Sequence, residues 1–219
     1  MRSETSALGV KIFVFDTETT GFINKKDPNL DNQPQVIQFA WILWDLTENN
    51  DWIWDWKEEK RVDILINPEK PIPFVSSQVH HLYDIDMKWK KNFSEQYEEI
   101  LELINTPDII VGHNIEYDEN MVKLELRRLE KEYEYKPKQV VCTMNESTNF
   151  CKLPKRDEKA KGFKRPKLGE LHKVLFKEYF IWAHDAMVDV EATLKSFIEL
   201  VNKWVIQLEK KEENVMSLF

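Results

Sequence analysis

The sequence predicts one α/β domain in which helices pack against a central β-sheet. Short apolar segments typical of buried strands come first along the chain, and strands then alternate with segments of helical periodicity. The length of 219 residues suits one well-buried domain, and 12 Phe, 8 Trp and 6 Tyr supply a core. We expect the domain to span residues 1–208, followed by a charged tail at 209–219 that ends in an apolar pentapeptide.

Three strands are expected in the first part of the chain. Lys11–Asp16 is a continuous apolar run, typical of a strand buried on both faces, and Val36–Leu46 and Trp52–Ile66 follow as its neighbours. In the third segment one strand face carries three tryptophans, Trp52, Trp54 and Trp56. We interpret this face as packing surface, with base stacking as the alternative.

The rest of the chain predicts four helices and two more strands. The first helix would be capped by Ser94 and would carry an apolar stripe from Tyr97 to Ile104. The other segments have the composition and periodicity of these elements: helices over Glu116–Lys131, Leu168–Phe176 and Asp185–Leu208, and strands over Asp108–Gly112 and Gln139–Met144.

The charge balance argues against a simple nucleic-acid binder. The chain has 31 basic and 39 acidic residues, a net charge of −8, whereas phosphate binding favours clustered cations. The objection weakens if carboxylates hold metal ions, because bound cations attract phosphate. The segment Lys152–Lys167 differs, with eight basic and two acidic residues. We interpret it as a phosphate-contacting loop, with a solvated loop as the alternative.

The remaining composition bears on location. Only Cys142 and Cys151 are present, without zinc-type spacing, and Met1–Val10 lacks the pattern of a signal peptide. No apolar stretch approaches the roughly 20 residues that span a bilayer. We therefore expect a cytoplasmic protein that does not contact a membrane.

Two carboxylates close the first predicted strand. Asp16 and Glu18 are two residues apart, so strand periodicity sends both side chains to the same face. Neighbouring carboxylates repel each other, and a bound cation would explain their placement. A solvent-facing acidic turn is the alternative.

Further acidic residues are predicted to face inward. Asp118 lies in the first turn of a helix, with the apolar Met121 and Val122 three and four positions on. Asp189 lies early in the last helix, and His184 stands just ahead of it, beside Asp185 as the expected cap. An unpaired buried charge is costly, so these positions favour a common site.

Three segments resemble the motifs of the DEDDh (DnaQ-like) exonuclease superfamily, which includes the epsilon proofreading subunit of bacterial DNA polymerase III, RNase T and oligoribonuclease. They are Asp16-Thr-Glu-Thr-Thr-Gly21, Gly112-His-Asn-Ile-Glu-Tyr-Asp118 and His184-Asp-Ala-Met-Val-Asp-Val-Glu-Ala-Thr193. The resemblance covers about Val10 to Val201, and three motifs in order are a specific signal.

The resemblance implies a ribonuclease H-like fold, with a five-stranded mixed sheet flanked by helices, and two divalent metal ions, Mg²⁺ or Mn²⁺. Asp16 would bridge both ions, Glu18 and Asp189 would complete one site, and Asp118 would help to hold the other. His184 would be the general base. The implied substrate-binding residues are Thr19, Thr20, His80 and Asn114.

Elementary chemistry agrees with this set of residues. Two metal ions about 3.5–4 Å apart clamp the attacking and leaving oxygens of an in-line displacement at phosphorus. Oxygen ligands without cysteine favour Mg²⁺ or Mn²⁺. A histidine of ordinary pKa, about 6.5, can accept a proton near neutral pH.

Two positions depart from the family pattern. His81 follows Val79-His80 where a glycine is common, and Tyr117 stands where phenylalanine is commoner. Neither is a metal-ligand position, but the first bears on nucleotide selectivity.

The chain ends in Val215-Met-Ser-Leu-Phe219, which resembles the bacterial sliding-clamp-binding peptide, although Val215 replaces its glutamine. Met216, Leu218 and Phe219 would contact a sliding clamp, or a DNA polymerase would be the partner. Packing on the chain's own surface or on a like subunit is the alternative.

We therefore expect a 3′-to-5′ exonuclease that acts on single-stranded DNA ends in proofreading or repair. The alternatives are an exoribonuclease of the RNase T or oligoribonuclease type, a nuclease domain that serves mainly as a polymerase partner, and a non-catalytic interaction module.

Overall fold

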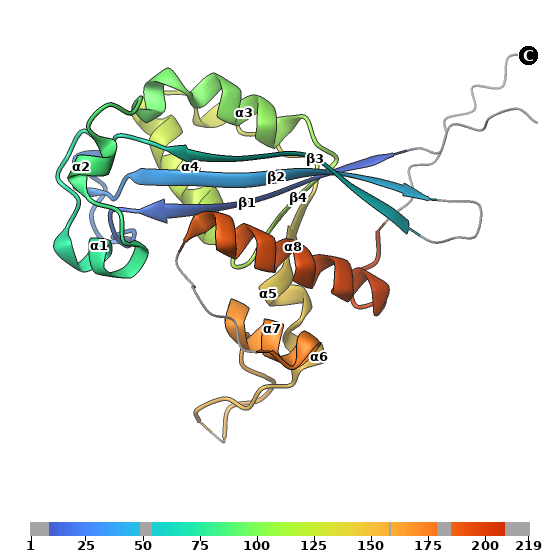
Figure 1. The fold of residues 1–219 in the computed structure, drawn as a ribbon. Coiled ribbons are helices and arrows are strands. Elements are labelled where there is room, and N and C mark those ends of the chain that lie inside the picture. The colour runs from blue at the N-terminus through green and yellow to red at the C-terminus, as the bar shows by residue number, and fades with distance from the viewer. Residues whose placement is uncertain (1–8, 49–53, 158, 179–184, 209–219) are drawn as a thin grey trace, which may run out of the picture.

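A computed structural model describes residues 9–48, 54–157, 159–178 and 185–208 (Figure 1). It confirms the α/β class and a five-stranded mixed sheet of order β3-β2-β1-β4-β5. The strands β1, β2 and β3 pair antiparallel, and β4 and β5 continue the sheet parallel to β1. Their bounds are β1 Val10–Thr19, β2 Val36–Glu48, β3 Trp54–Leu65, β4 Ile109–Gly112 and β5 Val140–Cys142.

Helices cover both faces of this sheet. Figure 1 shows α3 and α4 on one face and α8 on the other. The α-helices of the described residues are α1 Phe74–His80, α2 Asp84–Met87, α3 Tyr97–Asn105, α4 Glu116–Arg128, α5 Thr143–Glu146, α6 Thr148–Cys151, α7 Leu168–Phe176 and α8 Ala186–Asn202. Short 3₁₀ turns span Leu30–Asn32, Phe93–Glu95 and Glu132–Glu134. Within the described segments, no helix combines the length and apolarity needed to cross a membrane.

The side chains of β1 alternate between two hydrophobic clusters. Phe13 and Phe15 pack with α3 and α4, whereas Ile12 and Val14 pack with α8. The same alternation continues past the apolar run. It places Asp16 and Glu18 on the α8 side of the sheet, and Thr17 and Thr19 on the α4 side.

The neighbouring strand β4 stops before β1 does. It pairs with β1 only from Ile12 to Val14 and ends at Gly112. On its other edge, β1 stays paired with β2 as far as Thr19. The chain leaves β4 through Asn114, whose φ of 67° is left-handed and suits asparagine better than most residues. The end of β1 therefore has an open edge facing α4.

The face of β3 that carries Trp56 is packing surface. Its indole lies edge-on to the rings of Trp44, at 6.4 Å, and Phe197 of α8, at 6.1 Å. Trp52 lies outside the described residues. Burial of Phe197 in this cluster contributes about 3–5 kcal/mol by comparison with Phe-to-Ala changes in other cores.

Several predicted ends and one cap were wrong. Ser94 does not cap α3: its hydroxyl donates to Asn92 Oδ1, and Asn92 caps the preceding 3₁₀ turn. Helix α4 ends at Arg128 rather than Lys131, because Glu130 adopts a left-handed φ of 59°. Strand β5 stops at Cys142, where α5 begins.

The last helix also ends early, at Asn202, ahead of the left-handed Trp204. Its predicted start is confirmed, since the Asp185 carboxylate accepts from the N–H groups of Met187 and Val188. The short helices α1, α2, α5 and α6 were not predicted.

Candidate active site

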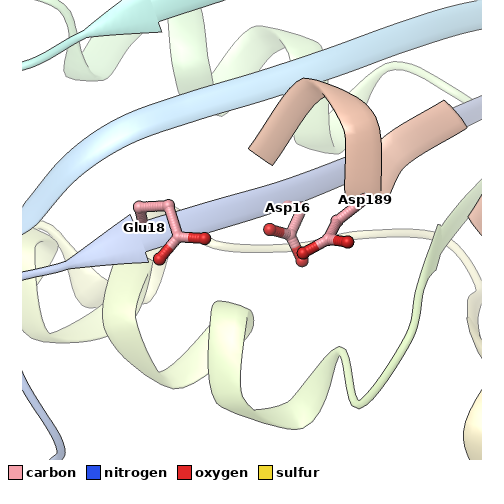
Figure 2. A group of neighbouring side chains, drawn as sticks. All are labelled: Asp16, Glu18 and Asp189. Atoms are coloured by element: carbon pink, nitrogen blue, oxygen red, sulfur yellow. The ribbon is translucent and has the colours of Figure 1, made fainter. Parts of the chain in front are cut away.

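Three carboxylates from distant parts of the chain meet at the end of β1. Asp16 and Glu18 come from β1, and Asp189 comes from the first turn of α8 (Figure 2). One oxygen from each lies within 4.8 Å of the others. Two oxygens bound on opposite sides of one Mg²⁺ are about 4.2 Å apart, so small side-chain movements would let all three reach a single ion.

Gln38, which was not predicted as a site residue, contacts the start of the helix that carries Asp189. Gln38 pairs with Glu18 across β1 and β2, and its buried amide bonds both oxygens of Asp63 at 3.0 Å. Its carbonyl oxygen accepts from Ala186 N–H, the first residue of α8, at 3.4 Å. Gln38 therefore ties the start of the helix to the strand beside the carboxylates. In the sequence, the sign of this role was a polar glutamine inside the otherwise apolar run of β2.

The fourth predicted carboxylate, Asp118, reaches the same place from α4. Its buried side chain accepts two hydrogen bonds from Thr17, from the backbone N–H at 3.0 Å and from the hydroxyl at 2.7 Å. Because β4 has already ended, this carboxylate bonds the part of β1 that has no neighbouring strand on that side. Asp118 lines one pocket with Asp16, Glu18 and Asp189.

Burial and mutual repulsion shape the charge of this cluster. Burial is the main cause that raises the pKa of Glu18 to about 8, and the charges of Asp189 and Asp118 add to it. Burial and the neighbouring carboxylates also raise the pKa of Asp16 well above its usual range. Burial raises the pKa of Asp118 to about 7 against the lowering effect of the Thr17 hydrogen bonds. Full ionisation near neutral pH therefore needs nearby positive charge, which divalent cations would supply.

The pocket has a volume of about 590 Å³ and two chemically different sides. The carboxylates form one side. The other is apolar and open to solvent: Phe22 is 91% exposed, and Val75 and Val79 of α1 are 74% and 43% exposed. Such a pocket is large enough for a nucleotide, with room for both a charged and an apolar part.

The predicted substrate-binding residues all line this pocket: Thr19, Thr20, His80 and Asn114. The hydroxyl of Thr19 is engaged internally, with Gly21 O at 2.9 Å and Tyr117 Oη at 2.8 Å. Their contact with a nucleotide stays a prediction.

Two of these residues also position their surroundings. Thr20 Oγ1 accepts from Gln35 N–H, and Thr20 O accepts from the hydroxyl of Ser76, which holds α1 against the first motif. His80 is buried, and its Nδ1 accepts from Leu82 N–H at 3.1 Å.

Some predicted positions lie outside the described part of the chain, and one departure from the family pattern has a structural explanation. His184 and the tail residues Met216, Leu218 and Phe219 lie outside the described residues, as does the division between domain and tail. His81 closes α1 with a left-handed φ of 60°, a conformation that explains why glycine is common at this position.

The sequence of the chain matches a known family. The RNase T family model, described as "Exonuclease", matches residues 13–197. The chain therefore belongs to this exonuclease family. No curated protein matches the sequence.

Solved structures support the fold. Exonuclease X in complex with 5′ overhanging duplex DNA is 15% identical, with a TM-score of 0.53, and the match covers 90% of this chain and 94% of that one. Exonuclease I is 16% identical with a TM-score of 0.63, over 88% of this chain and 41% of that chain. A 3′-exonuclease that recognises the histone mRNA stem-loop is 11% identical with a TM-score of 0.62, and the match covers 88% of this chain and 82% of that chain. At these identities the likeness shows the fold alone.

Proposed function

We propose that the protein hydrolyses phosphodiester bonds from the 3′ end of single-stranded DNA, using two divalent cations, Mg²⁺ or Mn²⁺. The observation that carries the proposal is the cluster of Asp16, Glu18 and Asp189, half-buried at the end of β1 with oxygens within 4.8 Å of one another. Membership of the exonuclease family supports the reaction class.

Each acidic residue has a role in this proposal. Asp16 would help to hold both ions, Glu18 and Asp189 would hold one of them, and Asp118, oriented by Thr17, would help to hold the other. When bound, the cations polarise the scissile phosphate and stabilise the attacking and leaving oxygens. His184 is assigned as the general base that takes the proton of the attacking water.

The pocket suits a 3′-terminal nucleotide. Its acidic side would hold the scissile phosphate through the cations, and its exposed apolar side would contact the base through Phe22, Val75 and Val79. A base in this position must leave the helical stack, so a single-stranded end is the preferred substrate.

A hydrolysis assay tests the proposal. Purified protein with Mn²⁺ should shorten a 5′-labelled DNA oligonucleotide stepwise from its 3′ end. Asp16→Asn should reduce the rate by at least about 10³-fold, because it removes the charge of the carboxylate that would hold both ions. Asp31→Asn, which changes an exposed carboxylate, is the matched control and should keep full activity. Fragments that shorten from the 5′ end would contradict the polarity.

RNA is the second candidate substrate, because one structurally similar 3′-exonuclease recognises a histone mRNA stem-loop. The pocket could accept or exclude the ribose 2′-hydroxyl, so DNA and RNA oligomers of one sequence should be compared under the same conditions. A higher kcat/KM on RNA would replace the DNA assignment and leave the metal chemistry unchanged.

The physiological setting is proposed to be proofreading or repair, with the tail residues contacting a polymerase or sliding clamp. A pull-down with and without residues 215–219 tests the contact. Equal recovery of the partner in both cases would contradict it.

A further inference from the structure

A basic surface begins beside the proposed active site. The segment Lys152–Lys167, here called the basic finger, carries eight Lys and Arg residues and two acidic ones, a local charge of +6. The rest of the chain has 23 basic and 37 acidic residues, so its charge is −14. The finger is therefore the main concentration of positive charge in an otherwise acidic sequence.

Its cations are available to solvent. Most of them are exposed: Lys152, Lys155, Arg156, Lys159, Lys161, Arg165 and Lys167. Among the described residues, acidic groups contact this segment at two places: Glu170 pairs with Lys164, and the Asp157 carboxylate accepts from Lys159 N–H. Phe163 is also exposed, which adds an aromatic ring among the charges.

The finger has a defined base. Lys164 N–H donates to Leu153 O at 2.9 Å, and Lys155 Nζ donates to Lys161 O at 2.6 Å. These bonds hold the outgoing and returning halves of the finger, its two arms, side by side. The segment projects beyond α6 and α7 (Figure 1). Beyond the Leu153–Lys164 pair each arm has about five residues, so the tip reaches at most about 17 Å from the base, or roughly five nucleotide steps of about 3.4 Å along a strand.

The base of the finger is tied to the second motif. His113 Nε2 lies 3.0 Å from Pro166 O, and because a carbonyl only accepts, the ring nitrogen is the donor. His113 itself lines the active-site pocket, as does Leu168, which follows the finger directly. A strand whose end enters the pocket therefore passes close to the finger's base.

We infer that the basic finger binds the phosphodiester backbone of the uncleaved part of the substrate strand, several nucleotides from the 3′ end. This inference rests on the proposed function and adds a second contact region to the same site. Phosphate is the ligand that matches exposed Lys and Arg side chains around an aromatic ring. In this arrangement the pocket selects the terminal nucleotide, and the finger provides affinity for the rest of the strand.

The test removes three exposed cations near the tip, in the variant Arg156→Gln/Lys159→Gln/Lys161→Gln. The matched control is Lys57→Gln/Lys136→Gln/Lys203→Gln, three exposed lysines outside the finger and the pocket. Lys155 and Lys164 are left intact because they hold the finger's base. Melting temperatures of both variants should equal that of the wild type, which shows that folding is unchanged.

Two measurements follow. First, kcat/KM is compared on a trinucleotide, which fills only the pocket, and on a long oligonucleotide. Neutralising the finger should raise KM for the long oligonucleotide about tenfold and leave the trinucleotide unchanged. Equal effects on both substrates, or none on either, would overturn the inference.

Second, binding of labelled DNA and RNA oligonucleotides is titrated over a range of salt concentrations. The slope of log K against log salt is negative, and its magnitude should fall by about 2 in the finger variant, from a contribution of about 0.7 for each of three contacted phosphates in single strands. An unchanged slope would overturn the inference. If the wild type binds with a finger-dependent slope but hydrolyses nothing, the proposed function fails and the finger contact stands.

Discussion

The carboxylate of Asp118 on α4 bonds Thr17 on β1 twice, at 3.0 Å to the backbone N–H and at 2.7 Å to the hydroxyl. These two residues are 101 positions apart in the sequence, and they meet where β4 no longer pairs with β1. The bonds fix the orientation of Asp118 and favour its ionised form. Thr17 is therefore a positioning residue for one of the proposed metal ligands.

Thr17→Val should weaken metal binding without removing a ligand. The variant loses the hydroxyl bond that lowers the pKa of Asp118, so this pKa rises and a larger fraction of the carboxyl is protonated near pH 7. We expect the Mn²⁺ concentration for half-maximal activity to rise about tenfold, as expected for one hydrogen bond to a charged group. The effect should shrink as pH rises. Thr17→Ser, which keeps a hydroxyl, is the control; an equal loss in both variants would contradict this role.

The metal-free protein should lose stability as pH rises from about 6.5 to 8. The pKa of Asp118 is raised to about 7 and that of Glu18 to about 8, so the folded state holds protons that the unfolded state has released. Where the folded state binds more protons, stability falls with increasing pH. Melting temperatures in EDTA should decline across this range, and Mn²⁺ should raise them most at pH 8. A metal-free melting temperature that rises over this range would contradict the raised pKa values.

Below about pH 6.5 one histidine has the opposite effect on stability, which it lowers as the pH falls. Burial lowers the pKa of His113 to about 4, so the unfolded state takes up its proton first as the pH falls. Stability from this residue is therefore present above about 6.5 and is lost as pH falls towards 4. The variant His113→Gln should lose less stability than the wild type between pH 6.5 and 4, as measured by chemical denaturation.

Phe22→Ala should weaken substrate binding while leaving folding unchanged. The ring is 91% exposed at the edge of the pocket and lies edge-on to Tyr117 at 6.3 Å. If it contacts the terminal base, its loss should raise KM by about 10- to 100-fold, the range of one base-aromatic contact. Trp89→Ala, at a ring that is 88% exposed and does not line this pocket, is the control. Unchanged KM in both variants would place the base elsewhere.

Tyr117→Phe tests the departure from the family pattern. The hydroxyl donates to Gly21 O at 2.8 Å and also contacts Thr19, so it fixes the turn that presents Phe22. Thr19 still bonds Gly21 O in the variant, and we expect KM to rise several-fold with kcat nearly unchanged. A fall in kcat at constant KM would instead connect the hydroxyl with the chemical step.

Sequence patterns predicted the parts of this structure that depend on local order. The strand segments have apolar runs, and the spacing of Asp16 and Glu18 follows directly from strand alternation. The burial of Asp118 follows from the helical positions of Met121 and Val122, both fully buried. These features require only the periodicity of one element.

The missed features depend on contacts between elements. Gln38 and Thr17 act through partners 148 and 101 residues away, which no local pattern reveals. The helix α1 is short and exposes much of its apolar surface, because that surface lines the pocket rather than the core. Its periodicity therefore could not be distinguished from that of a loop.

The two clusters on opposite faces of the sheet each supply one side of the acidic pocket, with Asp118 on the helix of one and Asp189 on the helix of the other. Ions held between them would act as a cross-link through the end of the sheet, joining the two layers on either side of β1. If the packing of either helical layer were weakened, the affinity for the ions should fall, even when every ligand is intact. Phe197 is buried in the core, far along α8 from Asp189. A smaller side chain at this position would loosen the helix that carries Asp189, and the affinity for the ions should fall.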